Sequence, residues 1–199
     1  SRTYSVNQQT SDSAPTMSAM VTGVKTDEGV ISVDQNVRFG DHRSVAGNEA
    51  KTILEYAEES GRSTGVVTTA RLTHATPAAC YAHAPDRDWE SDKDVLDGSR
   101  EAYDSGFPDI ARQLIEFKYG DGIEVAMGGG RSRFLPREVR DPEYDSQVGM
   151  RLDGRLYAYT LGNDDGNSGN YHEFDWRGPA FGTNPLDVPV NNINGPLYA

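Results

Sequence analysis

The chain has 199 residues, of which 31 are acidic and 19 are basic, so its formal net charge is −12 and its pI is about 4.7. It contains no cluster of Lys and Arg, which argues against nucleic acid as a partner. No run approaches the roughly 18 consecutive apolar residues of a membrane-spanning helix, so we expect no membrane span. The first residues carry no apolar run, so we expect no signal peptide in this chain. The single cysteine, Cys80, excludes an internal disulfide and a zinc site built from several cysteines.

Two helical patterns and then a strand pattern open the chain. Residues 13–24 place apolar side chains at three- and four-residue spacing behind Asp12, which predicts a helix with a capped first turn. Residues 48–60 repeat this pattern and stop at Gly61, a residue type that suits a helix C-terminus. The β-branched run at 65–70 predicts a buried strand.

Two further helices and a second strand follow. Residues 78–84 are predicted to form a short helix behind Pro77, and another helix is expected to open at Pro108, because proline suits a first helical turn. Residues 123–127 predict a strand that runs into three glycines. This alternation predicts an α/β fold with a doubly wound, mostly parallel sheet and helices on both faces.

The composition changes near residue 156. Residues 156–199 are rich in Gly, Asn and Pro and show no helical period. Such a composition is typical of irregular structure. We therefore expect an α/β segment over 1–155 and a loop-rich segment over 156–199.

Asp12 and Ser13 stand at the start of the first predicted helix. The Ser13 hydroxyl is therefore predicted at the positive end of the helix dipole, near backbone N–H groups, where an oxyanion or a phosphate binds well. A serine in this position is also an ordinary N-cap, so the position alone leaves both interpretations open.

Three further candidates follow the first predicted strand. His74 and Thr76 come just after the strand at 65–70, and open α/β sheets hold their ligands at the C-terminal ends of strands. Arg87 is expected near the same edge, and its planar guanidinium matches phosphate oxygens. Taken singly, His74 is also an ordinary loop residue and Arg87 an exposed surface charge.

Together these segments resemble alkaline phosphatases. The resemblance covers residues 1 to about 155, and the motifs occur in the family's order with the family's internal spacing. The matching stretches are Asp-Ser-Ala at 12–14, Thr-Gly-Val-Lys-Thr at 22–26, Gly-Val-Val-Thr-Thr-Ala at 65–70, His-Ala-Thr-Pro-Ala at 74–78, Tyr-Ala-His at 81–83 with Arg87, Gly-Gly-Gly-Arg at 128–131, Asp-Pro-Glu-Tyr at 141–144 and Arg-Leu-Asp-Gly at 151–154. The resemblance implies an incomplete alkaline phosphatase-like α/β fold.

The resemblance also implies roles for the candidate residues. Ser13 corresponds to the nucleophile, which forms a covalent phosphoserine and binds one of two zinc ions. Arg87 corresponds to the arginine that binds the phosphate, and Asp12 to the neighbour that orients it. Thr76 corresponds to a hydroxyl ligand of magnesium, and His74 to a residue beside that ion that does not bind it directly.

The activity implied by the resemblance is hydrolysis of small phosphate monoesters with Zn²⁺ and Mg²⁺ as cofactors. The family is commonly a homodimer and is commonly periplasmic or secreted, so the resemblance implies both for the intact enzyme. We find no counterpart in this chain for the family's remaining metal ligands, and therefore interpret it as a partial chain.

Two alternatives stay open. One is a relative that acts on phosphodiesters or sulfate esters, although Arg87 after His83 favours the monoester because it supplies charge for a dianionic group. The other is an inactive fragment that serves as a binding module. Tight zinc uptake and phosphoserine formation would distinguish an enzyme from such a module.

Overall fold

A parallel pair of strands forms the centre of the fold. The computed structural model describes residues 4–140, 148–159 and 171–175. Strand β1 (Gly65–Arg71) pairs in parallel with β2 (Val125–Gly129), with Val66 opposite Ala126. Parallel neighbours require a long crossover, and here it contains four helices, α3 to α6. The expected α/β fold with a parallel sheet is confirmed, with two parallel strands in the described part of the chain.

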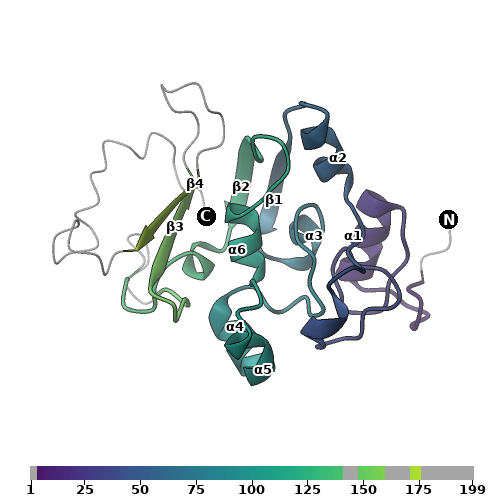
Figure 1. Ribbon diagram of the computed structural model, residues 1–199, viewed down its shortest axis with the longest axis horizontal. Helices are drawn as coiled ribbons and strands as arrows, with labels where there is room; N and C mark the ends of the chain where they lie inside the picture. The colour runs from purple at the N-terminus through teal and green to yellow at the C-terminus, as the bar shows by residue number, and fades with distance from the viewer. Residues whose placement is uncertain (1–3, 141–147, 160–170, 176–199) are drawn as a thin grey trace.

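Three helices pack beside this strand pair (Figure 1). Helix α1 (Ser13–Thr22) contacts both α2 (Ile53–Glu59) and α3 (Ala75–Ala78), and α3 also packs against β1. Their shared core is apolar and buried, and it extends to α6. It includes Ala14, Val21, Ile31, Val66, Ala78, Ile110, Leu114 and Ile123.

Local capping sets the bounds of α1 and α2. The helix predicted over 13–24 ends at Thr22, because Gly23 adopts the left-handed conformation with φ 76°. The helix predicted over 48–60 begins only at Ile53. Its N-cap Thr52 forms a capping box with Glu55, in which each side chain bonds the other residue's backbone N–H.

The crossover differs from the sequence prediction in two places. The short helix predicted over 78–84 is wrong: α3 covers Ala75–Ala78 behind its N-cap His74, and it shares only Ala78 with the predicted range. Two helices were not predicted, α4 (Asp92–Gly98) and α5 (Arg100–Asp104), and both begin at serine N-caps. The crossover ends with α6 (Ile110–Ile115), whose N-cap is Asp109, one residue after the predicted start at Pro108.

A second strand pair lies beyond β2. Strand β3 (Arg155–Tyr159) pairs antiparallel with β4 (Tyr171–Asp175), so part of the segment predicted to be loop-rich forms strands. The other residues of 156–199 lie outside the described ranges. Two short 3-10 helices, His42–Ser44 and Arg131–Arg133, complete the elements described. No helix within these ranges is long and apolar enough to cross a membrane.

A buried arginine joins β3 to α6. Arg151 is fully buried, and both terminal nitrogens of its guanidinium lie 3.0 Å from the carboxylate oxygens of Asp109. The same guanidinium donates to Asp153 at 2.7 and 3.1 Å and stacks on Tyr157, 4.3 Å from the ring centre. Asp109 is also the N-cap of α6, so this network fixes the start of that helix against the chain entering β3.

Candidate active site

Ser13 is the first residue of α1, as the sequence predicted, but it is not the cap of that helix. Asp12 is the N-cap, and its Oδ1 accepts a hydrogen bond from the Ala14 N–H at 2.8 Å. Pro15 has no N–H, so the first turn offers fewer backbone donors to an anion than the sequence alone indicated. The Ser13 hydroxyl makes no hydrogen bond to another described residue, which leaves its oxygen available.

Arg87 is held directly beside this helix start. Its Nη1 donates to Oδ2 of Asp12 at 2.8 Å, and both side chains are mostly buried. The Arg87 backbone N–H donates to the carbonyl of Gly29 at 2.8 Å. Asp12 therefore uses one carboxylate oxygen to cap α1 and the other to position the guanidinium.

His74 meets Arg87 from the other side. Its Nε2 lies 3.2 Å from Arg87 Nη2, and because a guanidinium only donates, this nitrogen is the acceptor. Burial lowers the pKa of His74, and the positive charges of Arg87 and Arg71 lower it further. A neutral imidazole with its proton on Nδ1 fits both observations.

Thr76 is the second residue of α3, the helix that follows β1. Its side chain is exposed, and its helix packs against α1, which carries Ser13. The structure thus brings Asp12, Arg87 and His74 into one hydrogen-bonded chain, and it places Thr76 on the neighbouring helix.

The sequence did not point to Glu28, whose side chain binds the backbone of Asp12. Its Oε1 accepts from the Asp12 N–H at 2.8 Å, while its own N–H donates to the Asn7 side chain at 2.8 Å. Its Oε2 is buried and has no hydrogen-bond partner in the described part of the chain. Nothing in the local sequence around Glu28 signals this role, because it depends on how the loop folds back onto α1.

A second missed residue, Glu90, anchors the end of β1. It accepts from Nε and Nη2 of Arg71 at 2.8 and 2.6 Å and from the Thr73 hydroxyl at 2.5 Å. Burial raises the pKa of Glu90, but these hydrogen bonds outweigh burial and hold it below its usual value. The segment that carries His74 is thereby fixed to the chain after Arg87.

The described residues at this site offer single metal ligands and do not form the complete ligand set of a metal ion. Ser13 and Thr76 each offer one hydroxyl, whereas Asp12 and His74 already hold Arg87. Zinc sites generally need three or four protein ligands. Within the described ranges, three His, Cys, Asp or Glu ligand atoms come together elsewhere, at Glu58, Asp121 and Glu124.

A family model for alkaline phosphatases matches residues 1–165. The chain belongs to the alkaline phosphatase family. It is 44% identical over 158 residues to an alkaline phosphatase of Gadus morhua, which covers 78% of this chain and 32% of that protein. It is also 44% identical over 157 residues to the human tissue-nonspecific isozyme, covering 77% of this chain and 29% of that one. The chain therefore spans about a third of the length of these family members.

Solved alkaline phosphatases also match part of this chain. The enzyme from the Antarctic bacterium TAB5 matches with a TM-score of 0.48 and 28% identity, over 67% of this chain and 30% of that one. The Thermus thermophilus enzyme matches with a TM-score of 0.48 and 31% identity, over 68% and 22%. Two variants of the TAB5 enzyme, with one histidine changed to aspartate or glutamate, have Mg bound in their M3 site.

Proposed function

We propose that the protein carrying this chain hydrolyses phosphate monoesters through a covalent phosphoserine at Ser13. The observation that carries the proposal is the fixed Arg87 guanidinium, held between Asp12 and His74 beside the start of α1, in a chain of the alkaline phosphatase family. A phosphate monoester is a dianion, and the protein's net charge of −12 would repel it without a local cation. Arg87 supplies that positive charge.

The remaining donors of Arg87 suit a phosphoryl group. A guanidinium has five N–H donors. Asp12 takes one on Nη1, His74 takes one on Nη2, and Nε lies 3.9 Å from Asp88 Oδ1. The second N–H of Nη1 and of Nη2 make no hydrogen bond to another described residue, so they can bind two oxygens of the phosphoryl group. Such contacts stabilise the charge on these oxygens as the phosphoryl group is transferred.

In the proposed first step, Ser13 Oγ loses its proton and forms a bond to phosphorus, while the ester P–O bond breaks and the leaving oxygen takes up a proton to become the alcohol. Water then breaks the Oγ–P bond and releases inorganic phosphate. No described side chain accepts a hydrogen bond from Ser13, so these residues do not form a serine–histidine pair. We propose that Ser13 contributes one ligand to zinc and Thr76 one to magnesium, with the other ligands outside the described ranges. Metal coordination lowers the pKa of a hydroxyl and makes it a better nucleophile.

The test is trapping of the phosphoenzyme in the complete protein that contains this chain. Acid quenching after addition of a labelled phosphate monoester is expected to yield phosphoserine in the wild type and none in Ser13→Ala. Ser11→Ala is the matched control, since it removes a neighbouring hydroxyl outside the helix and should keep the label. Label retained in Ser13→Ala would show that another residue is the nucleophile.

Substrate preference separates the proposal from its close alternative. We expect higher kcat/KM for a chromogenic phosphate monoester than for the corresponding phosphodiester or sulfate ester, because Arg87 matches a dianion. The opposite order would assign the site to diesters or sulfates. We further propose that the complete protein is an exported homodimer, which analytical ultracentrifugation and cell fractionation would test.

A further inference from the structure

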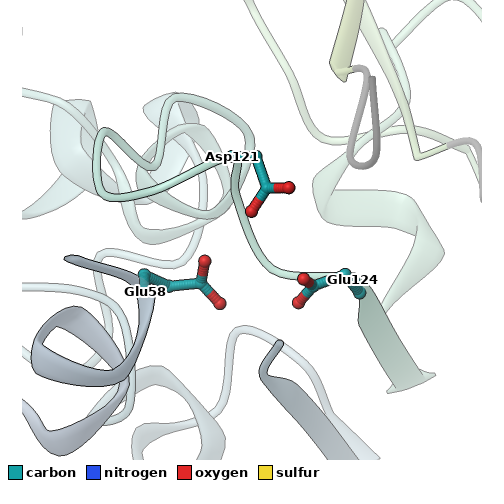
Figure 2. A group of neighbouring side chains, drawn as sticks. All are labelled: Glu58, Asp121 and Glu124. Carbon is teal, nitrogen blue, oxygen red and sulfur yellow. The ribbon is translucent and has the colours of Figure 1, made fainter. Parts of the chain in front are cut away.

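Three carboxylates converge at a place remote from Ser13 in the sequence and outside the site described above. Glu58 lies near the end of α2, while Asp121 and Glu124 lie in the loop between α6 and β2. One carboxylate oxygen from each residue lies within 4.8 Å of the other two. Figure 2 shows the three carboxylates pointing toward one another.

Glu58 is the buried member of this group. The residue is 1% exposed, and its Oε1 accepts from the Thr64 hydroxyl at 2.5 Å. Its Oε2 is also buried but has no hydrogen-bond partner in the described ranges. Leaving a buried carboxylate oxygen without a partner costs free energy, so native proteins normally satisfy it with a donor, water or ion.

The loop that carries Asp121 is shaped around this carboxylate. Gly120 adopts φ 58°, and a Cβ atom at this position would lie 2.6 Å from Glu58 Oε2 and 2.8 Å from the Glu58 carbonyl oxygen. Only glycine leaves this space open. The backbone therefore closes over the unpartnered oxygen without a side chain that would fill the gap.

Two of the three carboxylates, those of Glu58 and Glu124, have no positively charged side chain paired with them among the described residues. No described Lys or Arg forms an ion pair with Glu58 or Glu124, and Glu124 Oε2 is bonded instead to the Thr64 N–H at 2.6 Å. Burial raises the pKa of Glu58, and the nearby charges of Glu124 and Asp121 raise it further. A bound cation would relieve both the repulsion and the missing partner.

We propose that Glu58, Asp121 and Glu124 bind a divalent cation of the calcium type. Carboxylate oxygens are hard ligands, and calcium binds them at about 2.3–2.6 Å with flexible geometry. Three oxygens all within 4.8 Å of one another can therefore share one such ion. The ion would tie the end of α2 to the loop that leads into β2, and this role is independent of the function proposed above.

Calorimetric titration of the complete protein tests the site, with zinc and magnesium already saturating so that only additional binding is seen. Calcium chloride is expected to bind saturably at one site and to raise the melting temperature. Glu58→Gln and Glu124→Gln should each weaken calcium binding at least tenfold. Glu59→Gln is the matched control, because it removes the same charge from the adjacent position of α2, outside the cluster, and should bind as the wild type does.

Three results would overturn the proposal. The first is the absence of saturable calcium binding to a wild type whose circular dichroism shows it to be folded. The second is unchanged affinity in both Glu58→Gln and Glu124→Gln. The third is a higher melting temperature of Glu58→Gln together with no calcium uptake by the wild type, which would indicate a proton shared between carboxylates. Glu124→Gln keeps the test decisive if Glu58→Gln fails to fold, since Glu124 is less buried.

Discussion

Asp12 carries two separate tasks on its two carboxylate oxygens. Oδ1 caps α1 through the Ala14 N–H, and Oδ2 holds Arg87, each at 2.8 Å. The two tasks respond differently to substitution. A cap needs only one acceptor oxygen, whereas the arginine contact also needs the negative charge.

We predict that Asp12→Asn keeps the helix and loosens the arginine. Asn caps helices about as well as Asp, so the melting temperature should change little. Loss of a charge-assisted hydrogen bond to Arg87 should weaken inhibition by inorganic phosphate by about 1.5–3 kcal/mol, or roughly 10- to 150-fold. Asp12→Ala should show the same loss and also lower the free energy of unfolding by about 1 kcal/mol. Unchanged inhibition by phosphate in both variants would show that Arg87 does not bind the phosphate.

His83 predicts a dependence of stability on pH. Its Nδ1 faces the Ser32 carbonyl at 2.6 Å and its Nε2 faces Glu55 Oε1 at 2.8 Å, so both ring nitrogens donate and the imidazolium is favoured. Burial alone would lower the pKa of His83, but the hydrogen bond and charge of Glu55, with a further contribution from Glu49, raise it above the ordinary 6.5. The folded protein therefore holds this proton more tightly than the unfolded chain.

The stabilisation from His83 is accordingly complete below about pH 6.5 and is lost as the pH rises through the raised folded-state pKa. Urea unfolding between pH 6 and 9 should show the free energy of unfolding falling across this interval in the wild type. Glu55→Gln should flatten the slope, because the amide no longer favours the charged ring. An equally steep slope in Glu55→Gln would assign the pH dependence to other groups.

At the scale of elements, apolar periodicity predicted α1 and α2, a β-branched run predicted β1, and a short segment before three glycines predicted β2. Capping residues then decided the bounds of the helices. The start of α2 moved to Ile53 because the capping box at Thr52 competes with an earlier start. Helix α4 was not predicted because its sequence, Asp-Lys-Asp-Val-Leu-Asp-Gly, has too few apolar residues to show an apolar face with helical spacing. Strand β4 depends on pairing with a distant segment, which local pattern does not encode.

The candidate site shows the same division. The sequence pattern predicted that His74 and Thr76 lie at the end of β1 and that Arg87 lies near the same edge, whereas the contact between Asp12 and Arg87 was implied only by the resemblance to alkaline phosphatases. It predicted a capped first turn but left open whether Ser13 is the cap, which is Asp12, and it did not predict that Glu28 supports Asp12, since that contact joins distant residues through a folded loop. Burial and geometry, rather than residue type, decide such contacts.

The buried arginine between α6 and β3 gives the largest stability prediction. Arg151→Met should lower the free energy of unfolding by about 3–5 kcal/mol, because it leaves the Asp109 carboxylate buried without its partner. Arg100→Met is the matched control, since its exposed pair with Asp104 should contribute less than about 1 kcal/mol. Chemical denaturation of both variants measures the difference.

A double variant separates an unpaired charge from lost packing. Asp109→Leu combined with Arg151→Met should recover part of the stability lost in Arg151→Met, because a buried apolar pair carries no unpaired charge. The second charge partner, Asp153, is partly exposed and can be solvated in this variant. No recovery at all would show that the cap of α6, rather than the ion pair, dominates.

At the scale of the whole molecule, we expect the supply of metal ligands to determine activity. Residues 1–199 span about a third of the related enzymes, and the described residues near Ser13 supply single metal donors. We predict that the 199-residue chain expressed alone shows no turnover of a chromogenic phosphate monoester, even with added zinc and magnesium. The complete protein under the same conditions is the positive control. Metal-dependent turnover by the isolated chain that disappears in Ser13→Ala would contradict this prediction.

The contacts that hold Arg87 have a consequence for conformational entropy. A free arginine side chain carries about 2 kcal/mol of rotamer entropy, which an anion would have to remove on binding. Here the Gly29 carbonyl fixes the backbone of Arg87, while Asp12 and His74 fix both ends of the guanidinium before any anion arrives. That ordering cost is met during folding, so an anion that binds at Arg87 gains its hydrogen bonds without first immobilising a flexible side chain.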